Sequence, residues 1–205
     1  MKLFSSLAWP LVVACVLFAA MLAQAAPSGD PNTVQAGVYN VEPTHTRVLF
    51  SVTHFGFTRY YGDFAGVTGK LSIDPHNVSA AHVEVSIPVA SISTTNTKLD
   101  SELKGANWLN ADAYPTITFV SRRVTQTGPK TAQIEGLLTL RGVTHPVVLD
   151  ASFNAAGPYP LGGRFTVGFD ATAHLKRSDF GVSPYVGLVG DDVDVIISAA
   201  FQKAG

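Results

Sequence analysis

The sequence predicts an all-β protein, a closed up-and-down barrel of about eight antiparallel strands with one short helical segment. Apolar residues recur at every second position over most of the chain after residue 37, the period of strands with one buried face. A single stretch, residues 94–115, lacks that period, and no repeat or second domain boundary is visible. Closure into a barrel removes exposed sheet edges, and eight strands can hold one small ligand. A two-sheet sandwich with an ordinary core is the alternative architecture.

The first strands carry an internal inconsistency that predicts a bend. The segment around residues 48–52 places Val48, Phe50 and Val52 on the inner face. Between about residues 60 and 73, inward positions are even-numbered up to Phe64 and odd-numbered from Val67 onward. A one-residue slip reverses every side chain of a strand, so we expect a bulge or tight bend near residues 65–66.

The remaining strands follow the same alternation. A third strand spans about residues 82–89, a short one lies at residues 117–119, and four longer strands follow. Their predicted inward residues are Val83, Val85, Ile87 and Val89, then Ala132, Ile134, Gly136, Leu138 and Leu140, then Val147, Leu149, Ala151 and Phe153, then Phe165, Val167, Phe169, Ala171, Ala173 and Leu175, and finally Val193, Val195, Ile197 and Ala199.

The segment 94–115 predicts a short amphipathic helix. Leu99 and Leu103 lie four residues apart, one turn of a helix, among charged neighbours. Gly105 is a typical residue at which such a helix ends. Trp108 adds an apolar residue after the helix and is expected near the mouth of the barrel.

The N-terminus has the pattern of a secretory signal at residues 1–25. Lys2 precedes a long apolar run, and Ala23-Gln24-Ala25 has the small-x-small form of a cleavage site. A transmembrane anchor is the alternative, since the apolar run is nearly long enough to span a bilayer. Cys15 gives a second alternative, lipidation, although the apolar run continues past it. Cleavage near Ala25 predicts a periplasmic or secreted protein, with a flexible linker at residues 26–36 and the barrel domain at residues 37–205.

Composition argues against several classes of function. The formal net charge is −1, with no long basic run, so a nucleic-acid partner is not expected. Signal cleavage removes the single cysteine and with it disulfide and thiolate chemistry. The six histidines form no His-x-His or His-x-x-x-His pair, and no metal or other cofactor is expected. The chain also lacks a Gly-x-Ser-x-Gly nucleophile motif.

Two polar features have both a structural and a functional interpretation. His54 follows Phe50 and Val52 onto the inner face, either as a buried, hydrogen-bonded histidine or as a contact for a ligand headgroup. His174 is expected on the outer face without an active role. Residues 176–181 form either a capped turn, with Asp179 accepting backbone hydrogen bonds and Arg177 pairing nearby, or a polar rim that orients a headgroup.

The chain from about Val38 to Phe201 resembles the YceI-like family of exported, lipocalin-like polyisoprenoid-binding proteins. The resemblance rests on an ordered set of short motifs: Tyr39-Asn40-Val41-Glu42-Pro43-Thr44-His45-Thr46 before Val48-Leu49-Phe50-Ser51-Val52-Thr53-His54, then Gly62-Asp63-Phe64, Gly69-Lys70-Leu71-Ser72-Ile73-Asp74, Tyr114-Pro115-Thr116-Ile117-Thr118-Phe119-Val120-Ser121, Gly136-Leu137-Leu138-Thr139-Leu140-Arg141-Gly142-Val143-Thr144 and Arg177-Ser178-Asp179-Phe180-Gly181. The chain departs from the family at Glu42, where Asp is usual, and at residues 98–100, where the family has an Arg-Asp pair.

The resemblance implies an extended, lipocalin-like eight-stranded antiparallel barrel around an elongated apolar pocket for an isoprenoid-chain lipid such as a quinone precursor. It carries over no catalytic residues. We therefore expect an exported carrier that is not an enzyme, works as a monomer or homodimer, and contacts membranes transiently for ligand exchange. The expected ligand-binding residues are Val48, Phe50, Val52, His54, Phe64, Trp108, Phe119, Phe165, Val167 and Phe169. An enzyme using His54 and a nearby acid on a lipid-linked substrate, and a protein that recruits a partner through an exposed apolar patch, are the alternatives.

Overall fold

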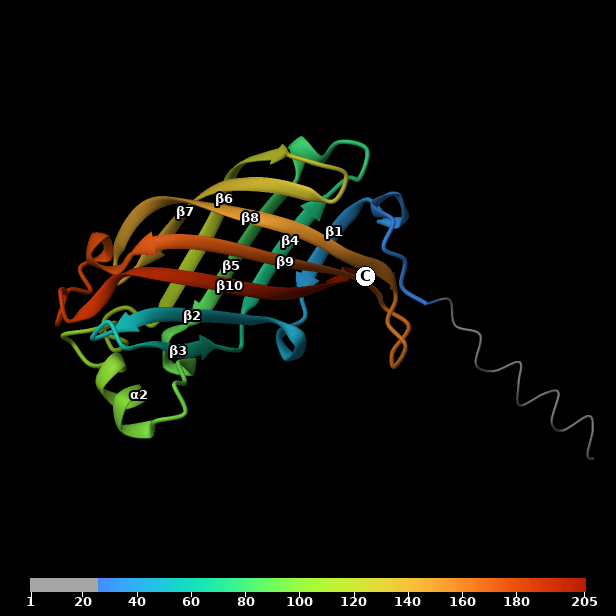
Figure 1. The fold of residues 1–205 in the computed structure, drawn as a ribbon. Coiled ribbons are helices and arrows are strands. Elements are labelled where there is room, and N and C mark those ends of the chain that lie inside the picture. The colour runs from blue at the N-terminus through green and yellow to red at the C-terminus, as the bar shows by residue number, and fades with distance from the viewer. Residues whose placement is uncertain (1–25) are drawn as a thin grey trace, which may run out of the picture.

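The computed structural model describes residues 26–205 and consists mostly of sheet (Figure 1). The ten strands are β1 (Gly37–Val41), β2 (Arg47–His54), β3 (Thr58–Phe64), β4 (Thr68–Ile73), β5 (His82–Pro88), β6 (Thr116–Gln126), β7 (Thr131–Leu140), β8 (Val143–Pro158), β9 (Phe165–Lys176) and β10 (Val189–Lys203). The helix α2 spans Thr97–Lys104, and short 3-10 turns lie at η1 (Pro31–Thr33), η2 (Pro43–His45), η3 (Val78–Ala80), η4 (Val89–Ser91) and η5 (Arg177–Phe180).

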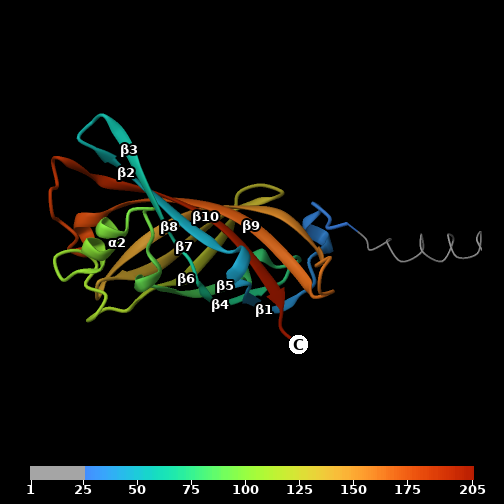
Figure 2. The ribbon, with the colours of Figure 1, turned by 90° about the horizontal axis from the view of Figure 1, so that it is seen from below.

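Eight of the strands form the predicted closed antiparallel barrel. Their order is β1-β4-β5-β6-β7-β8-β9-β10, and β1 pairs with β10 to close it. The long strand β10 pairs with β1 near its C-terminal end and with β2 along Val189–Ser198. Strands β2 and β3 therefore form an additional hairpin that projects from one end of the barrel (Figure 2).

The predicted bend between the halves of the second segment is confirmed. Strand β3 ends at Phe64 and β4 begins at Thr68, with Gly66 between them at a φ of 67°. Phe64 and Val67 are both buried although their positions differ in parity. A left-handed residue at this point costs little because glycine has no side chain, and it switches which face points inward.

The predicted helix is confirmed at Thr97–Lys104. The side chain of Asn96 accepts hydrogen bonds from the backbone N–H groups of Lys98 and Leu99, and Gly105 caps the C-terminus. Asp100 in the first turn accepts hydrogen bonds from the backbone N and the Oγ1 of Thr94, at 2.7 and 2.6 Å. These contacts attach the helix to the segment that follows β5.

Residues 27–36, where the composition predicts a linker, lie against the barrel. Ser28 pairs with Ala156 of β8, and the Asp30 side chain caps η1. Val34 is buried at 6% exposure in the main core cluster. Residues 1–25 are outside the described residues, so the signal peptide, its anchor alternative and lipidation at Cys15 stay predictions. Within residues 26–205, no helix combines the length and apolarity needed to span a bilayer.

Candidate ligand-binding cavity

The barrel encloses an elongated cavity of about 920 Å³. Strands β2, β5, β7 and β9 end on one side of the barrel, which we call the mouth, and β4, β6 and β8 end on the opposite side, the far end. The cavity has lining residues at both, with His54, Trp108 and Tyr185 at the mouth and Asn32 and Lys130 at the far end. It therefore runs along the length of the barrel, as expected for a site that holds an extended molecule.

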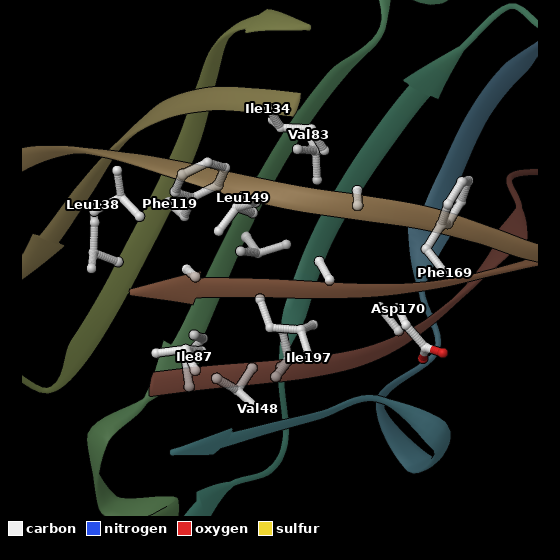
Figure 3. Close-up of a pocket in the computed structure, with 18 of the residues that line it drawn as sticks. Val48, Val83, Ile87, Phe119, Ile134, Leu138, Leu149, Phe169, Asp170 and Ile197 are labelled. Atoms are coloured by element: carbon white, nitrogen blue, oxygen red, sulfur yellow. The ribbon is translucent and has the colours of Figure 1, made fainter. Parts of the chain in front are cut away.

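The middle of the cavity wall is apolar and follows the predicted alternation. Figure 3 shows side chains from several strands converging on one space. Among them are Val48, Val83, Ile87, Phe119, Ile134, Leu138, Leu149 and Ile197. All of these except Phe119 belong to the inward sets that period two predicts, and Phe119 was expected to bind ligand. The wall offers an apolar chain many dispersion contacts and few polar groups.

Eight of the ten expected ligand-binding residues line the cavity. They are Val48, Phe50, Val52, His54, Phe64, Trp108, Phe119 and Phe169. Phe165 and Val167 do not line it, although both lie at alternate positions that predict an inward side chain. The β8–β9 register shifts between Phe153 and Ala155, and beyond that bulge Val167 is fully buried in the core cluster, with Phe165 packed against it. Whether the eight bind a ligand stays a prediction.

Several lining residues come from segments without strand periodicity. Leu99 and Leu103 of α2 reach the cavity, as their i,i+4 spacing could have indicated. Tyr185 belongs to the loop between η5 and β10, and its ring centroid lies 6.2 Å from that of Trp108. Asp30 and Asn32 of the N-terminal segment line the far end. The sequence carries no local signal for these last three contacts.

His54 lies at the mouth in an aromatic environment. Its ring packs edge-on against Phe55 at 4.3 Å between centroids and lies 5.9 Å from Tyr60. Among residues 26–205, the histidines that pair with carboxylates are His45 and His174, so the acid that catalysis by His54 would need is not beside it. The same residues contain no group of three or more side chains suited to hold a metal ion.

Arg177 holds the loop at the mouth together. Its guanidinium donates to the carbonyl oxygens of Gly190, Val182, Pro184 and Val189, at 2.8–3.0 Å. The residue is 5% exposed, lines the cavity and lies 5.7 Å from the centroid of the Trp108 ring. Burial lowers the pKa of Arg177, while the charge of Asp191 opposes that shift.

The structure corrects the capping carboxylate expected in residues 176–181. Asp191, rather than Asp179, accepts hydrogen bonds from the backbone N and Oγ of Ser178, at 2.9 and 2.7 Å. His174 lies on the outer wall, as expected, with its ring nitrogens 2.8 Å from Asp194 and 3.3 Å from Asp192. Hydrogen bonding to Asp194 and then to Asp192 raises the pKa of His174.

Exposed apolar side chains surround the mouth, and we call them the lip: Phe55, Phe57, Tyr185, Val186 and Leu188. The backbone N of Phe55 donates to the carbonyl of Leu188 at 2.9 Å, so the hairpin tip and the loop before β10 form one surface. Phe57 is 89% exposed. Residues 55–58 and 182–190 contain no Asp, Glu, Lys or Arg. The lip is thus an uncharged apolar surface that continues into the cavity through Phe55 and Tyr185.

Comparison with known proteins identifies the family. The sequence pattern of the YceI-like domain matches residues 39–201. The chain belongs to the YceI-like family. A UPF0312 protein of Ectopseudomonas mendocina is 39% identical over 154 residues, which cover 75% of this chain and 80% of that protein. Protein YceI of Escherichia coli is 38% identical over 157 residues, covering 77% of this chain and 81% of the relative.

Solved structures share the fold of this YceI-like chain. Burkholderia cenocepacia BcnA matches with a TM-score of 0.71 at 22% identity, over 78% of this chain and 98% of BcnA. A polyisoprenoid-binding domain from Saccharophagus degradans matches with a TM-score of 0.64 at 12% identity, over 83% of this chain and all of that domain. At these identities the likeness shows a common barrel, independently of the sequence match.

Proposed function

We propose that this protein is an exported carrier that holds one polyisoprenoid or similar long-chain amphiphile in its barrel, without catalysis. The observation that carries the proposal is the elongated apolar cavity of about 920 Å³, open toward an apolar mouth. This volume is at the upper end of the roughly 300–1,000 Å³ typical of small-molecule sites. The Saccharophagus degradans neighbour is described as polyisoprenoid-binding. Its ligand class fits the shape of this cavity, and for this chain that class is part of the proposal.

The hydrophobic effect alone supplies enough affinity for such a ligand. Burial of one methylene group is worth about 0.8 kcal/mol, so ten give about 8 kcal/mol before the costs of ordering the chain. That value corresponds to a dissociation constant near the micromolar range. Polar groups at the mouth then need only fix the position of the chain. The lining agrees with this division, because the cavity wall is apolar and its few polar side chains lie toward the two ends of the cavity.

Binding without catalysis is the simpler role for this site. Turnover by His54 would require a proton-transfer partner, and its neighbours are the rings of Phe55 and Tyr60. The N-terminal signal supports placement in the periplasm or outside the cell. Monomer and homodimer are both compatible with the carrier, because one barrel contains the whole cavity.

The lip supports exchange of ligand with a membrane. A long apolar chain that left the cavity through water would lose the free energy of burial along its whole length. Contact between the lip and a bilayer lets the chain pass from one apolar medium to another. Aromatic side chains such as Phe55, Phe57 and Tyr185 are the type found at membrane interfaces, and the lack of charged residues in segments 55–58 and 182–190 fits that environment.

The carrier role is tested by extraction and by a variant that fills the cavity. Protein purified after export is extracted with organic solvent for mass spectrometry, and the intact protein is analysed by native mass spectrometry. We expect a long-chain lipid at about one per barrel. Ala171→Phe places a ring in the cavity and should lower the bound fraction by at least about fivefold, because added volume in a packed site excludes the chain.

Thr172→Phe is the matched control, because Thr172 is the next residue of β9 and is exposed on the outer face. It should retain lipid at the level of the unchanged protein. The proposal fails if the unchanged protein neither co-purifies with lipid nor takes up added polyprenol. Turnover of a quinone precursor that is lost in His54→Ala, with binding retained, would instead establish the enzyme.

A further inference from the structure

Strand β3 has a free edge. Of the ten strands within residues 26–205, it is the one that pairs with a single neighbouring strand, β2, because the barrel closes through β1 and β10. Figure 2 shows the hairpin of β2 and β3 projecting beyond the end of the barrel. A free edge presents unpaired backbone N–H and C=O groups, which can pair with a strand of another chain.

The pairing of the hairpin identifies which backbone groups are free. In an antiparallel ladder, alternate residues direct their N–H and C=O groups toward the neighbouring strand and away from it. Asp63 exchanges two hydrogen bonds with Ser93, both at 2.9 Å, on the side of β3 that faces away from β2. Tyr61 and Arg59 follow Asp63 at two-residue spacing, so their backbone groups point the same way. These groups have no backbone partner within the described part of the chain.

The free stretch of β3 has defined ends. At one end, Ser93 occupies the edge beside Asp63. At the other end, the backbone N of Phe57 donates to the carbonyl of His54 inside the turn, at 3.1 Å. The range Thr58–Gly62 lies between them, in a ladder without a register shift. An added strand therefore has room along this range alone.

The free stretch lacks the features that keep sheet edges of natural proteins apart. It contains no proline, lysine or bulge. Its one charged residue, Arg59, lies back across the outer face, where the guanidinium donates to Oγ of Ser51 at 2.7 Å and to Asp194. Tyr61, two residues further along, is 58% exposed. The edge is thus suited to pairing and is not protected from it.

The backbone of this stretch is complementary to a second copy of itself. Antiparallel pairing about a two-fold axis at Tyr60 places Arg59 opposite the partner's Tyr61, and the reverse. Each such pair exchanges two hydrogen bonds, so the two pairs form four and use every free group. A two-fold axis at Arg59 or at Tyr61 would instead engage Phe57 or Asp63, whose N–H groups are already used.

The side chains are complementary in the same register. On the outer face, the Arg59 guanidinium lies beside the ring of the partner's Tyr61, an arrangement that favours a cation–π contact. On the inner face, Tyr60 lies opposite the partner's Tyr60, and aromatic cross-strand pairs stabilise a sheet. Both copies make the same contacts, as an interface between identical surfaces requires.

We propose that the mature protein forms a two-fold symmetric dimer, in which Thr58–Gly62 of β3 pairs antiparallel with the same residues of a second copy. This inference goes beyond the carrier function and does not depend on it. A stretch of this length makes a small interface, so the dimer is transient and forms as the protein concentration rises. Because Tyr60 also lines the cavity at the mouth, the mouths of the two barrels lie at the interface.

The first test measures association of the mature chain by sedimentation velocity, over about a hundredfold range of protein concentration. The unchanged protein should shift from monomer toward dimer. Tyr61→Pro should weaken association at least about tenfold, because it removes one hydrogen-bond donor from each copy. This N–H makes no bond inside the chain, so circular dichroism should show an unchanged fold. Tyr61→Ser is the matched control, since it keeps the N–H and loses only the ring, and should weaken association by a smaller factor.

The second test crosslinks the two copies. Cleavage near Ala25 leaves no cysteine in the mature chain, so one cysteine can be added without background. Tyr60→Cys faces its own counterpart across the two-fold axis, with Cα atoms about 4.5 Å apart, and mild oxidation should form a disulfide between the copies. Thr58→Cys is the control, because its counterpart lies roughly 13 Å away along the strands. It should stay unlinked. This test decides the matter if Tyr61→Pro does not fold.

Three results would overturn the proposal. A protein that stays monomeric at every concentration would leave the edge of β3 to an extended strand of a different protein. A dimer that Tyr61→Pro does not weaken and Tyr60→Cys does not link would place the interface on another surface. Equal linking through Thr58→Cys and Tyr60→Cys would exclude the assigned register. The carrier function would stand in each case, because one barrel contains the whole cavity.

Discussion

The two ends of the barrel use similar aromatic side chains in opposite ways. At the far end, Phe169 packs edge-to-face with Phe153 and Phe201, at 5.7 and 6.2 Å between centroids, and Val34 of the N-terminal segment is buried in the same core cluster. At the mouth, Phe55 and Tyr185 both line the cavity and are 51% and 61% exposed. Aromatic rings therefore pack together at the far end and are exposed at the mouth.

Backbone conformation separates the two ends as clearly. Residues 26–205 contain five non-glycine residues with positive φ, namely Phe55, Thr95, Asn110, Arg141 and Tyr185. All five lie in connections at the mouth, whereas Gly37 and Gly163 take the positive φ values at the far end. A left-handed conformation costs a non-glycine residue about 1–2 kcal/mol. The strained non-glycine residues are thus concentrated at the mouth, and such a concentration is typical of a functional site on a stable scaffold.

The largest expected effect, on ligand uptake and folding, comes from placing a charge in the apolar cavity between the two ends. Phe50→Asp should abolish ligand uptake or folding, because an unpaired carboxylate would lie in the apolar cavity beside Phe64, whose ring is 5.6 Å from that of Phe50. Tyr61→Ser, on the exposed face of β3, should change the free energy of unfolding by less than about 0.5 kcal/mol. Chemical denaturation and lipid uptake measure both variants, and uptake retained in Phe50→Asp would contradict the assigned wall.

A smaller effect, confined to the mouth, is expected for Arg177. Arg177→Met removes the donors of four backbone carbonyls and should lower the free energy of unfolding by about 3 kcal/mol. Hydrogen exchange should then speed up in residues 177–190 before it does in β8 and β9 at the far end. The exposed neighbour Lys176, changed to Gln, is the control and should leave the exchange pattern unaltered. Uniform acceleration at both ends would show that the mouth is not a separate unit.

The barrel and most of its cavity could be predicted from sequence because strand periodicity is local information. Alternation places Val83, Ile134 and Leu149 on the inner face without knowledge of which strands are neighbours. The parity conflict between Phe64 and Val67 even located the bend. Parity alone failed for Phe165 and Val167, since the bulge opposite β9 and the covering N-terminal segment decide whether an inward side chain meets the cavity or the core.

A smaller pocket of about 510 Å³ beside the mouth could not be predicted in this way. It brings residues 102–108, 141 and 181–185 together, and their contact depends on barrel closure rather than on any local pattern. Arg141 occurs in a turn, where periodicity ends, and nothing in its neighbourhood of the sequence distinguishes it from a solvated arginine. The capping carboxylate was misplaced for a related reason, because Asp191 reaches Ser178 from the next strand.

The smallest effect on stability, and the most direct test of the contrast between the ends, comes from one exposed residue at each. Phe57 at the mouth and Leu161 in the turn between β8 and β9 at the far end are 89% and 88% exposed. Replacing either with Ser should change the free energy of unfolding by less than about 0.5 kcal/mol, since neither side chain packs in the core. Only Phe57→Ser should slow transfer of a fluorescent farnesyl lipid from phosphatidylcholine vesicles, followed by stopped-flow fluorescence.

We expect that slowing to be about tenfold, because insertion of one phenylalanine ring into the bilayer interface is worth about 1.5–3 kcal/mol at full burial, and partial insertion realises the lower part of that range. An equal effect of Leu161→Ser would mean that both ends meet the membrane and that the aromatic packing of the far end opens during exchange. No effect of either variant would mean that ligand crosses water or that a protein partner covers the lip. If transfer depends on Phe57 alone, the ligand enters and leaves the barrel through the mouth. That route agrees with the exposed aromatic side chains, the strained turns and the uncharged lip at this end.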